Sequence, residues 1–179
     1  MNMSSLKENS LLQGGKYKIE RVLGQGGFGI TYLAVQVMLG RKVCIKEFFF
    51  KDYCDRTPAG SVISTTSSNK EIVARFLNKF LKEARTISRL EHPNIIRILD
   101  IFEENGTAYY VMEYIDGNSL EEKVNRQGAL SENEAVEYVK QVGNALDYIH
   151  QQRINHLDVK PANIMLRKSD NKAILIDFG

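Results

Sequence analysis

The 179-residue sequence predicts an α+β fold built from two dissimilar halves. The first half contains short segments rich in β-branched and aromatic residues, which favour strands, and one amphipathic helical pattern. The second half opens with a longer amphipathic helical pattern and returns to a strand near its end. No internal repeat at the spacing of solenoid arrays interrupts this order. We therefore expect a strand-rich half with one helix, followed by the beginning of a helical half.

The expected strands are short runs of apolar, aromatic and β-branched residues. They are 16–23, 30–37, 42–46, 98–103, 108–114 and 173–176. A glycine cluster separates the first two runs, which predicts two strands joined by a glycine turn. Asn105-Gly106 separates the fourth run from the fifth, and this dipeptide is typical of a tight hairpin.

Two segments place apolar residues at helical spacing. The first covers 76–90, and the second covers 131–149. Ser131 and Glu134 give the second segment a capping-box pattern at its start. The connection over 48–69 has no helical periodicity, and we expect a solvated polar loop whose serine and threonine hydroxyls could accept phosphate.

Composition narrows the class of protein but names no function. Hydrophobic residues make up 43% of the chain, enough for a real core, and the formal charge of +2 gives no reason to expect nucleic acid or anionic membrane as a partner. No apolar run approaches the roughly 18 residues that cross a bilayer. The segment 1–14 lacks the apolar region of a signal peptide and is expected to be a flexible tail. Two cysteines are too few for a disulfide framework, which predicts a reduced, cytoplasmic protein.

The segment Gly24–Gly29 (GQGGFG) matches the pattern G-x-G-x-x-G. In dinucleotide-binding folds this pattern opens a helix. Here the glycines are followed by 30–33 (ITYL), which favours a strand. We therefore expect a glycine hairpin, which can fold over a triphosphate and offer backbone N–H groups to it. A plain β-turn is the alternative, but it would need fewer glycines.

Lys46 lies at the end of an apolar strand, where alternation places it on the same face as Cys44. Glu83 falls within the apolar stripe of the first helix, and a carboxylate there is costly unless it is paired. Lys46 is an obvious partner, and such a pair could hold the ammonium group against phosphate oxygens. The alternative is that Glu83 lies at a wet edge of the stripe.

A third cluster lies in 156–163 (HLDVKPAN). Asp158 could accept a hydroxyl proton, Lys160 could neutralise a moving phosphoryl group, and Asn163 could bind a metal. Mg²⁺ prefers such oxygen ligands. Asp177, in Asp177-Phe178-Gly179, places a second carboxylate at a strand end. Each cluster alone could be an ordinary turn, but their order is that of the protein kinase signature.

With these motifs the sequence resembles the first two-thirds of a bacterial serine/threonine protein kinase domain, from about Tyr17 to Gly179. The resemblance implies a bilobal protein-kinase-like fold: a flexible tail over 1–14, a β-rich N-lobe with one long helix and a hinge over 15–115, and a partial C-lobe over 116–179 that ends at the D-F-G motif. It implies ATP- and Mg²⁺-dependent phosphoryl transfer to Ser/Thr hydroxyls of protein substrates in signalling. No nucleic-acid partner and no membrane segment are expected.

The resemblance also assigns roles to individual residues. Lys46 would contact the ATP phosphates and pair with Glu83. Asp158 would be the catalytic base, and Lys160 follows it at the spacing of serine/threonine rather than tyrosine kinases. The implied Mg²⁺ ligands are Asn163 and Asp177. Leu157 replaces the usual arginine before the catalytic aspartate, so we expect an enzyme that does not depend on activation-loop phosphorylation.

Segment 111–115 (VMEYI) looks like the hinge, with Met112 as gatekeeper and the Glu113 carbonyl and Ile115 N–H at the adenine edge. The full set of implied ATP contacts is Gly24, Gln25, Gly26, Gly27, Phe28, Gly29, Thr31, Cys44, Lys46, Met112, Glu113, Ile115 and Met165. Thr31 and Cys44 replace the valine and alanine usual in the family, which alters the pocket surface.

Two other functions stay open at this stage. One is a truncated module that binds nucleotide or a partner without transferring phosphate, since the resemblance stops at Gly179 and a fragment is expected. The other is a nucleotide-binding dehydrogenase. It is disfavoured because no acidic residue follows the glycines at the distance that reads a ribose within a βαβ unit.

Overall fold

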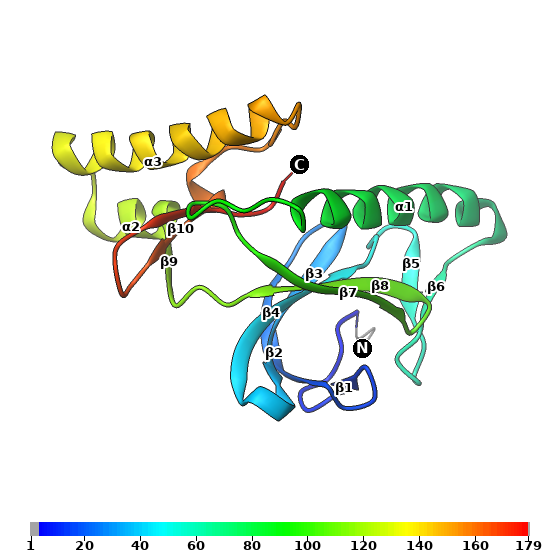
Figure 1. Ribbon diagram of the computed structural model, residues 1–179. Coiled ribbons are helices and arrows are strands. Elements are labelled where there is room, and N and C mark those ends of the chain that lie inside the picture. Colours follow the sequence, from blue (N-terminus) through cyan, green and yellow to red (C-terminus); the bar gives the residue numbers. More distant parts are fainter. Residues whose placement is uncertain (1–3, 179) are drawn as a thin grey trace. The chain divides into compact units, whose positions relative to one another are not determined.

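The computed structural model describes residues 4–178, whose elements are labelled in Figure 1. The chain forms two compact units. The first contains the described residues up to Ser88 together with Ile98–Tyr114, and the second contains Arg89–Arg97 together with the described residues from Ile115 onward. The predicted α+β class is confirmed, because strands dominate the first unit and helices cover a small sheet in the second.

The first unit is built on a six-stranded antiparallel sheet in the order β1-β2-β3-β4-β8-β7. Its strands are β1 (Leu11–Leu12), β2 (Tyr17–Gln25), β3 (Gly29–Gln36), β4 (Arg41–Phe48), β7 (Ile98–Glu104) and β8 (Thr107–Glu113). All but β1 were predicted from alternation and β-propensity. The sheet curls so that its two edges meet: Lys16 Nζ lies 2.5 Å from Asp100 Oδ2, and the Tyr17 ring stacks 6.0 Å from Phe102.

The N-terminal segment is a correction to the sequence prediction. A flexible tail was expected over 1–14, but residues 4–14 pack against the sheet, and positions 1–3 lie outside the described residues. Leu12 is fully buried, and β1 pairs with β2 through Leu11 and Lys18. The backbone N–H of Leu6 donates to the hydroxyl of Tyr32 at 3.0 Å. Leu6 and Leu12 are the buried leucines of this segment. Two apolar positions are too few to produce a periodic pattern in the sequence.

The connection over 48–69 is a second correction. Instead of a solvated loop it contains a hairpin of β5 (Cys54–Arg56) and β6 (Val62–Ser64), followed by a 3-10 turn at Ser67–Asn69. Cys54 of β5 and Val62 of β6 are buried in the core of the first unit. Strands of three residues are too short for alternation to reveal them.

Helix α1 (Lys70–Ile87) lies on the sheet of the first unit (Figure 1). Its buried residues are Leu81, Ala84 and Ile87. The Phe80 ring contacts Tyr110 of β8 at 5.0 Å and Phe48 of β4 at 5.7 Å between ring centroids. The helix begins six residues before the predicted start at position 76, and its first turn already contains Ile72 and Val73.

The second unit contains α2 (Leu120–Gln127), α3 (Glu132–Gln151) and a three-stranded sheet in the order β11-β10-β9. Its strands are β9 (Gly117–Ser119), β10 (Ile164–Arg167) and β11 (Ala173–Leu175). Ser131 Oγ accepts from Glu134 N at the start of α3, as predicted. A reciprocal capping box that was not predicted starts α2, between Ser119 and Glu122.

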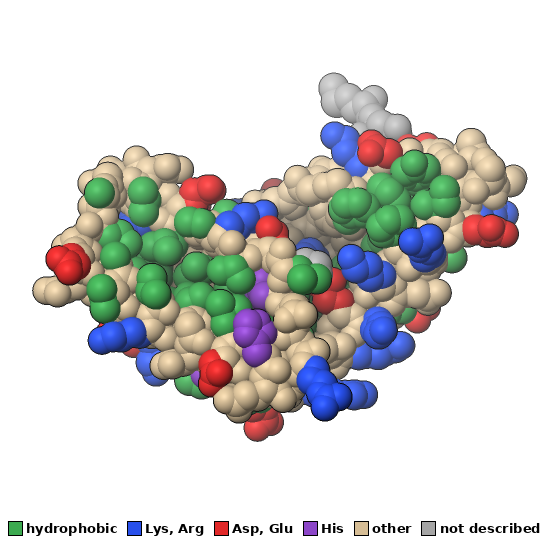
Figure 2. Space-filling model, turned by 90° about the horizontal axis from the view of Figure 1, so that it is seen from above, with side chains coloured by type: hydrophobic (Ala, Val, Ile, Leu, Met, Phe, Trp, Pro, Cys, Tyr) green, Lys and Arg blue, Asp and Glu red, His purple; other side chains and the backbone are tan. Residues whose placement is uncertain are grey.

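Segment 89–97 belongs to the second unit because it pairs with β11. Ile95 bridges Leu175 in parallel, and the buried amide of Asn94 donates to the Ala173 carbonyl at 2.8 Å. Hydrophobic side chains also gather on the outer surface of α3 (Figure 2), where Val139 of the predicted stripe is 71% exposed. Within residues 4–178, no helix combines the length and the apolar character needed to cross a membrane.

Candidate active site

The glycine loop joins β2 to β3 as a hairpin, as predicted. None of Gly24, Gly26, Gly27 and Gly29 has a positive φ, so the backbone does not require glycine at these positions. A Cβ added to Gly24, Gly26 or Gly27 would meet no atom within 4 Å. Neither the backbone conformation nor a steric contact within the protein therefore requires glycine at these three positions. Open space beside successive backbone groups is what a close-approaching phosphate requires.

Gly29 has a different reason to be glycine. A Cβ at this position would lie 2.9 Å from the carbonyl oxygen of Glu47, so only glycine lets β3 approach β4 this closely. The end of the glycine loop therefore packs closely against β4, the strand that carries Lys46.

Lys46 projects from β4 on the face that alternation predicted. It pairs with Thr31 of β3 and Tyr110 of β8, and it is half-buried together with Cys44 while Val43 and Ile45 are buried on the other face. Its ammonium group lies 5.8 Å from the centroid of the Tyr110 ring.

Glu83 is half-buried on α1, on the side of the helix that packs against the sheet. It follows Phe80 by three residues, which places the two side chains on one helix face. Phe80 contacts the same Tyr110 ring that the Lys46 ammonium group faces. The sheet and helix thus bring the turn that carries Glu83 beside the strand that carries Lys46, which supports the predicted pairing.

The residues predicted to contact adenine are divided between the two units. In the first unit, Cys44 pairs with the buried Met112, whose neighbour Glu113 ends β8. In the second unit, Ile115 is buried, and Met165 lies half-buried in β10 opposite Ile174 and Ser119.

Asp158, Lys160 and Asn163 are brought together in the second unit by the turn that leads into the 3-10 segment Pro161–Asn163. Lys160 Nζ lies 2.8 Å from Asp158 Oδ2, and Asn163 Nδ2 donates to the same oxygen at 2.8 Å. The Asn163 amide also donates to the Asp158 carbonyl at 2.9 Å. The hydrogen bond from Lys160, and then that from Asn163, lower the pKa of the Asp158 carboxyl below its ordinary value.

His156 and Ile176 link this turn to the D-F-G segment. His156 is buried, its Nε2 donates to the Ile176 carbonyl at 2.9 Å, and its Nδ1 accepts from the Asp158 N–H at 3.3 Å. The Ile176 N–H donates to the Asn163 carbonyl at 2.9 Å. These bonds fix the backbone on the N-terminal side of Asp177, whose φ is positive at 49°. The ring centroids of Phe178 and His156 lie 4.5 Å apart. Gly179 lies outside the described residues.

Comparison with known proteins decides the family. The family model of the protein kinase domain matches residues 17–179. This chain belongs to the protein kinase family.

Two relatives of this chain are bacterial serine/threonine kinases, as predicted. Serine/threonine-protein kinase B of Synechocystis is 36% identical over 173 residues, which cover 96% of this chain and 28% of the relative. PrkC of Bacillus subtilis is 36% identical over 165 residues, which cover 92% of this chain and 22% of the relative. The chain therefore spans only about a quarter of the length of these two kinases.

Solved structures confirm the protein-kinase-like fold. The apo form of PpkA-294 superposes with a TM-score of 0.91 at 29% identity, over 98% of this chain and 62% of that one. Rad53 in complex with AMP-PNP superposes with a TM-score of 0.73 at 26% identity, over 93% of this chain and 39% of that one.

One polar cluster of the first unit was missed from the sequence. Glu47 follows Lys46 on the buried face of β4 and is fully buried. Its carboxylate accepts from Tyr32 at 2.6 Å and from Tyr109 at 2.7 Å, and it pairs with the Arg56 guanidinium at 2.6 Å. Burial and the Glu47 charge raise the pKa of both tyrosines, which keeps their hydroxyls protonated as donors.

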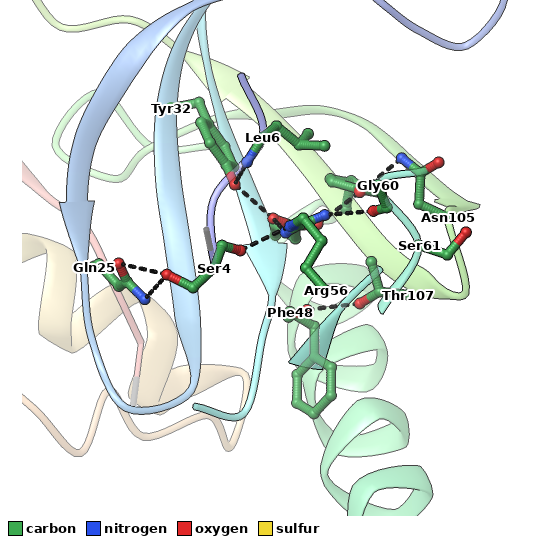
Figure 3. Close-up of polar contacts among 12 residues, drawn as sticks. Ser4, Leu6, Gln25, Tyr32, Phe48, Arg56, Gly60, Ser61, Asn105 and Thr107 are labelled. Atoms are coloured by element: carbon green, nitrogen blue, oxygen red, sulfur yellow. Dashed lines mark hydrogen bonds and ion pairs between the residues drawn. The ribbon is translucent and has the colours of Figure 1, made fainter. Parts of the chain in front are cut away.

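Arg56 extends this cluster to the segments that were expected to be loose (Figure 3). Its Nε donates to the Ser4 carbonyl and its Nη1 to the Gly60 carbonyl, each at 2.7 Å. The one sequence signal was Glu47 itself, a carboxylate on the alternation face that Val43 and Ile45 make apolar.

Proposed function

We propose that this chain binds ATP with Mg²⁺ and transfers the γ-phosphoryl group to Ser/Thr hydroxyls of protein substrates. The observation that carries the proposal is the arrangement of Asp158, Lys160 and Asn163 within 2.8 Å contacts. This turn contains a proton acceptor, a cation and an amide. Asp177 lies next to it in space, because the N–H of Ile176 donates to the Asn163 carbonyl.

Asp158 is suited to orient a hydroxyl rather than to act as a strong base. The ion pair and the Asn163 hydrogen bond both use Oδ2, which leaves Oδ1 to accept the substrate's hydroxyl proton. The lowered pKa of the carboxyl makes it a weak base. A weak base is sufficient because phosphoryl transfer passes through a loose transition state, in which positioning and charge neutralisation matter most. Lys160, half-exposed beside Asp158, supplies positive charge where the phosphoryl group moves.

Asn163 and Asp177 fit the demands of Mg²⁺. Both hydrogen bonds of the Asn163 amide are made by Nδ2, so the amide orientation is set and Oδ1 is its remaining group. An amide oxygen and a carboxylate are hard ligands, and Mg²⁺ usually takes one or two of them and fills its shell with phosphate oxygens and water. When bound, the ion neutralises charge on the phosphates.

The nucleotide side of the proposal rests on the glycine loop and Lys46. The open space at Gly24, Gly26 and Gly27 fits a phosphate that approaches the backbone closely. Lys46 lies one strand away, opposite Thr31, where its ammonium group can reach phosphate oxygens. Binding of AMP-PNP by the structurally similar Rad53 supports an adenine nucleotide as the ligand. Cys44 and Cys54 are not joined in a disulfide, which suits a reducing, cytoplasmic compartment.

The test is transfer of radiolabelled γ-phosphate from ATP to an unfolded Ser/Thr-rich protein, followed by phosphoamino-acid analysis. The 179-residue chain should label serine or threonine, and Asp158→Asn should reduce the rate by about 10²- to 10⁴-fold. ATP binding by calorimetry should survive that substitution, because Asp158 faces the hydroxyl rather than the nucleotide. If the chain binds ATP but transfers no phosphate, the proposal is wrong and the chain is a nucleotide-binding module. Transfer that Asp158→Asn leaves unchanged would refute the assigned role.

A further inference from the structure

The tip of the glycine loop is held by an aromatic cluster. The Phe28 ring is 55% exposed, yet it stacks on Phe76 of α1 with ring centroids 5.3 Å apart and planes 24° apart. Phe50, just after β4, contacts Phe28 at 4.7 Å and Phe76 at 4.9 Å, and Tyr53 supports Phe50 at 4.5 Å. In Figure 2, hydrophobic side chains gather on the surface where α1 lies. The Phe28 ring is therefore engaged by the helix.

Backbone hydrogen bonds hold the same loop from its other side. The N–H of Phe49 donates to the Phe28 carbonyl at 3.1 Å, and the N–H of Lys51 donates to the Gly27 carbonyl at 3.0 Å. Within the loop, the N–H of Gly26 donates to the Gly29 carbonyl at 2.9 Å. The ladder between β3 and β4 thus continues past Lys46 up to the tip of the loop, and this tip is set against both β4 and α1.

Phe76 connects the loop to the part of α1 that carries Glu83. The two residues lie two helical turns apart, on the face that also presents Phe80 to the sheet. A helix moves as a rigid element, so a displacement of the turn at Glu83 also displaces Phe76. Phe28 would then lose its stacking partner, because aromatic pairs are stabilised only at short centroid separations.

We propose that Phe50 and Phe76 are positioning residues that hold the glycine loop, through Phe28, in the conformation that receives the phosphates. The affinity for nucleotide then depends on the position of α1. The inference rests on the proposed function in one respect, the binding of ATP by the glycine loop.

The first experiment measures calorimetric binding of Mg²⁺·ADP to the chain and to Phe76→Leu and Phe50→Leu. Each variant should bind about two- to tenfold more weakly, the range expected for loss of one aromatic pair. Phe102→Leu is the matched control, since Phe102 stacks on Tyr17 and Tyr109 in the same unit. It should leave affinity within about twofold. Phe76→Tyr keeps the ring and should restore binding. Equal losses in Phe76→Leu and Phe102→Leu would overturn the proposal.

The second experiment needs no nucleotide. The chain contains no tryptophan, so Phe28→Trp places a single tryptophan at the tip of the loop, which can be excited selectively at wavelengths where the tyrosines do not absorb. Adding Phe76→Leu should shift its emission to the red and raise the acrylamide quenching constant about twofold or more, while adding Phe102→Leu should change neither. Quenching that Phe76→Leu does not alter would overturn the proposal. If the unmutated chain fails to bind Mg²⁺·ADP, the proposed function falls, and this fluorescence readout still decides whether the helix holds the loop.

Discussion

The buried ion pair between Glu47 and Arg56 gives the sharpest prediction about stability. Arg56→Met keeps an unbranched apolar stem but removes the guanidinium that pairs with Glu47, lies over the Phe49 ring and donates to the Ser4 and Gly60 carbonyls. The side chain of Glu47 is 0% exposed and that of Arg56 is 4% exposed, so water does not screen the loss. Removing one partner of a buried pair costs about 3–5 kcal/mol. The hydroxyls of Tyr32 and Tyr109 remain as donors, which favours the lower end of this range.

Thermal unfolding followed by circular dichroism measures this effect. For a chain of this size, 1 kcal/mol corresponds to about 2–4 °C, so Arg56→Met should lower Tm by about 6 °C or more. Arg41→Met is the control, because Arg41 lies exposed at the start of β4 and bonds only Gln36 among the described residues. It should change stability by no more than about 0.5 kcal/mol. Equal Tm values for the two variants would refute the view that this ion pair secures the hairpin β5–β6.

Three further predictions concern the second unit. Gly117→Ala would place a Cβ 1.9 Å from a backbone oxygen of β10 and should destabilise the chain by about 1–3 kcal/mol or more. Gly143→Ala, in open space on α3, should instead stabilise the chain by about 0.5–1 kcal/mol. The midpoints of urea unfolding of the two variants measure both effects. Burial lowers the pKa of His156 below 6.5, so the unfolded chain binds this proton more tightly. Stability should therefore be full above pH 6.5 and fall as the pH drops through the folded-state pKa, and His156→Asn should flatten that fall in a series of melts. The carboxyl of Asp158 should titrate below 3.8 by NMR, and Lys160→Met should raise its midpoint, since Lys160 is the main cause of the lowered pKa.

The sequence predicted the elements whose side chains repeat over several turns or strand positions. Segment 42–46 became the centre of β4, and 131–149 became α3, because burial on one face fixes their periods. The order of the motifs predicted the family, since each motif has a distinct residue pattern. The polar turn around Asp158 was predicted by its residue types, although the contact of Lys160 with Asp158 itself was not.

The elements that were missed depend on tertiary contacts. Arg56 lies in a three-residue strand, and its partner Glu47 lies in another strand. No local sequence pattern therefore predicts this ion pair. The N-terminal segment is ordered by Leu12 and by hydrogen bonds to distant groups such as the hydroxyl of Tyr32. Stacking of Phe28 on Phe76 joins residues far apart in the chain, which periodicity cannot indicate.

We propose above that the glycine loop receives nucleotide phosphates. Gly26→Val tests it most directly, because a Cβ at this position meets no protein atom and the φ of Gly26 is not positive. The variant should therefore melt at the temperature of the unmutated chain. Its calorimetric affinity for Mg²⁺·ATP should fall by about tenfold or more, as a side chain enters the space meant for phosphate oxygens. An unchanged affinity in a variant with unchanged Tm would contradict the claim.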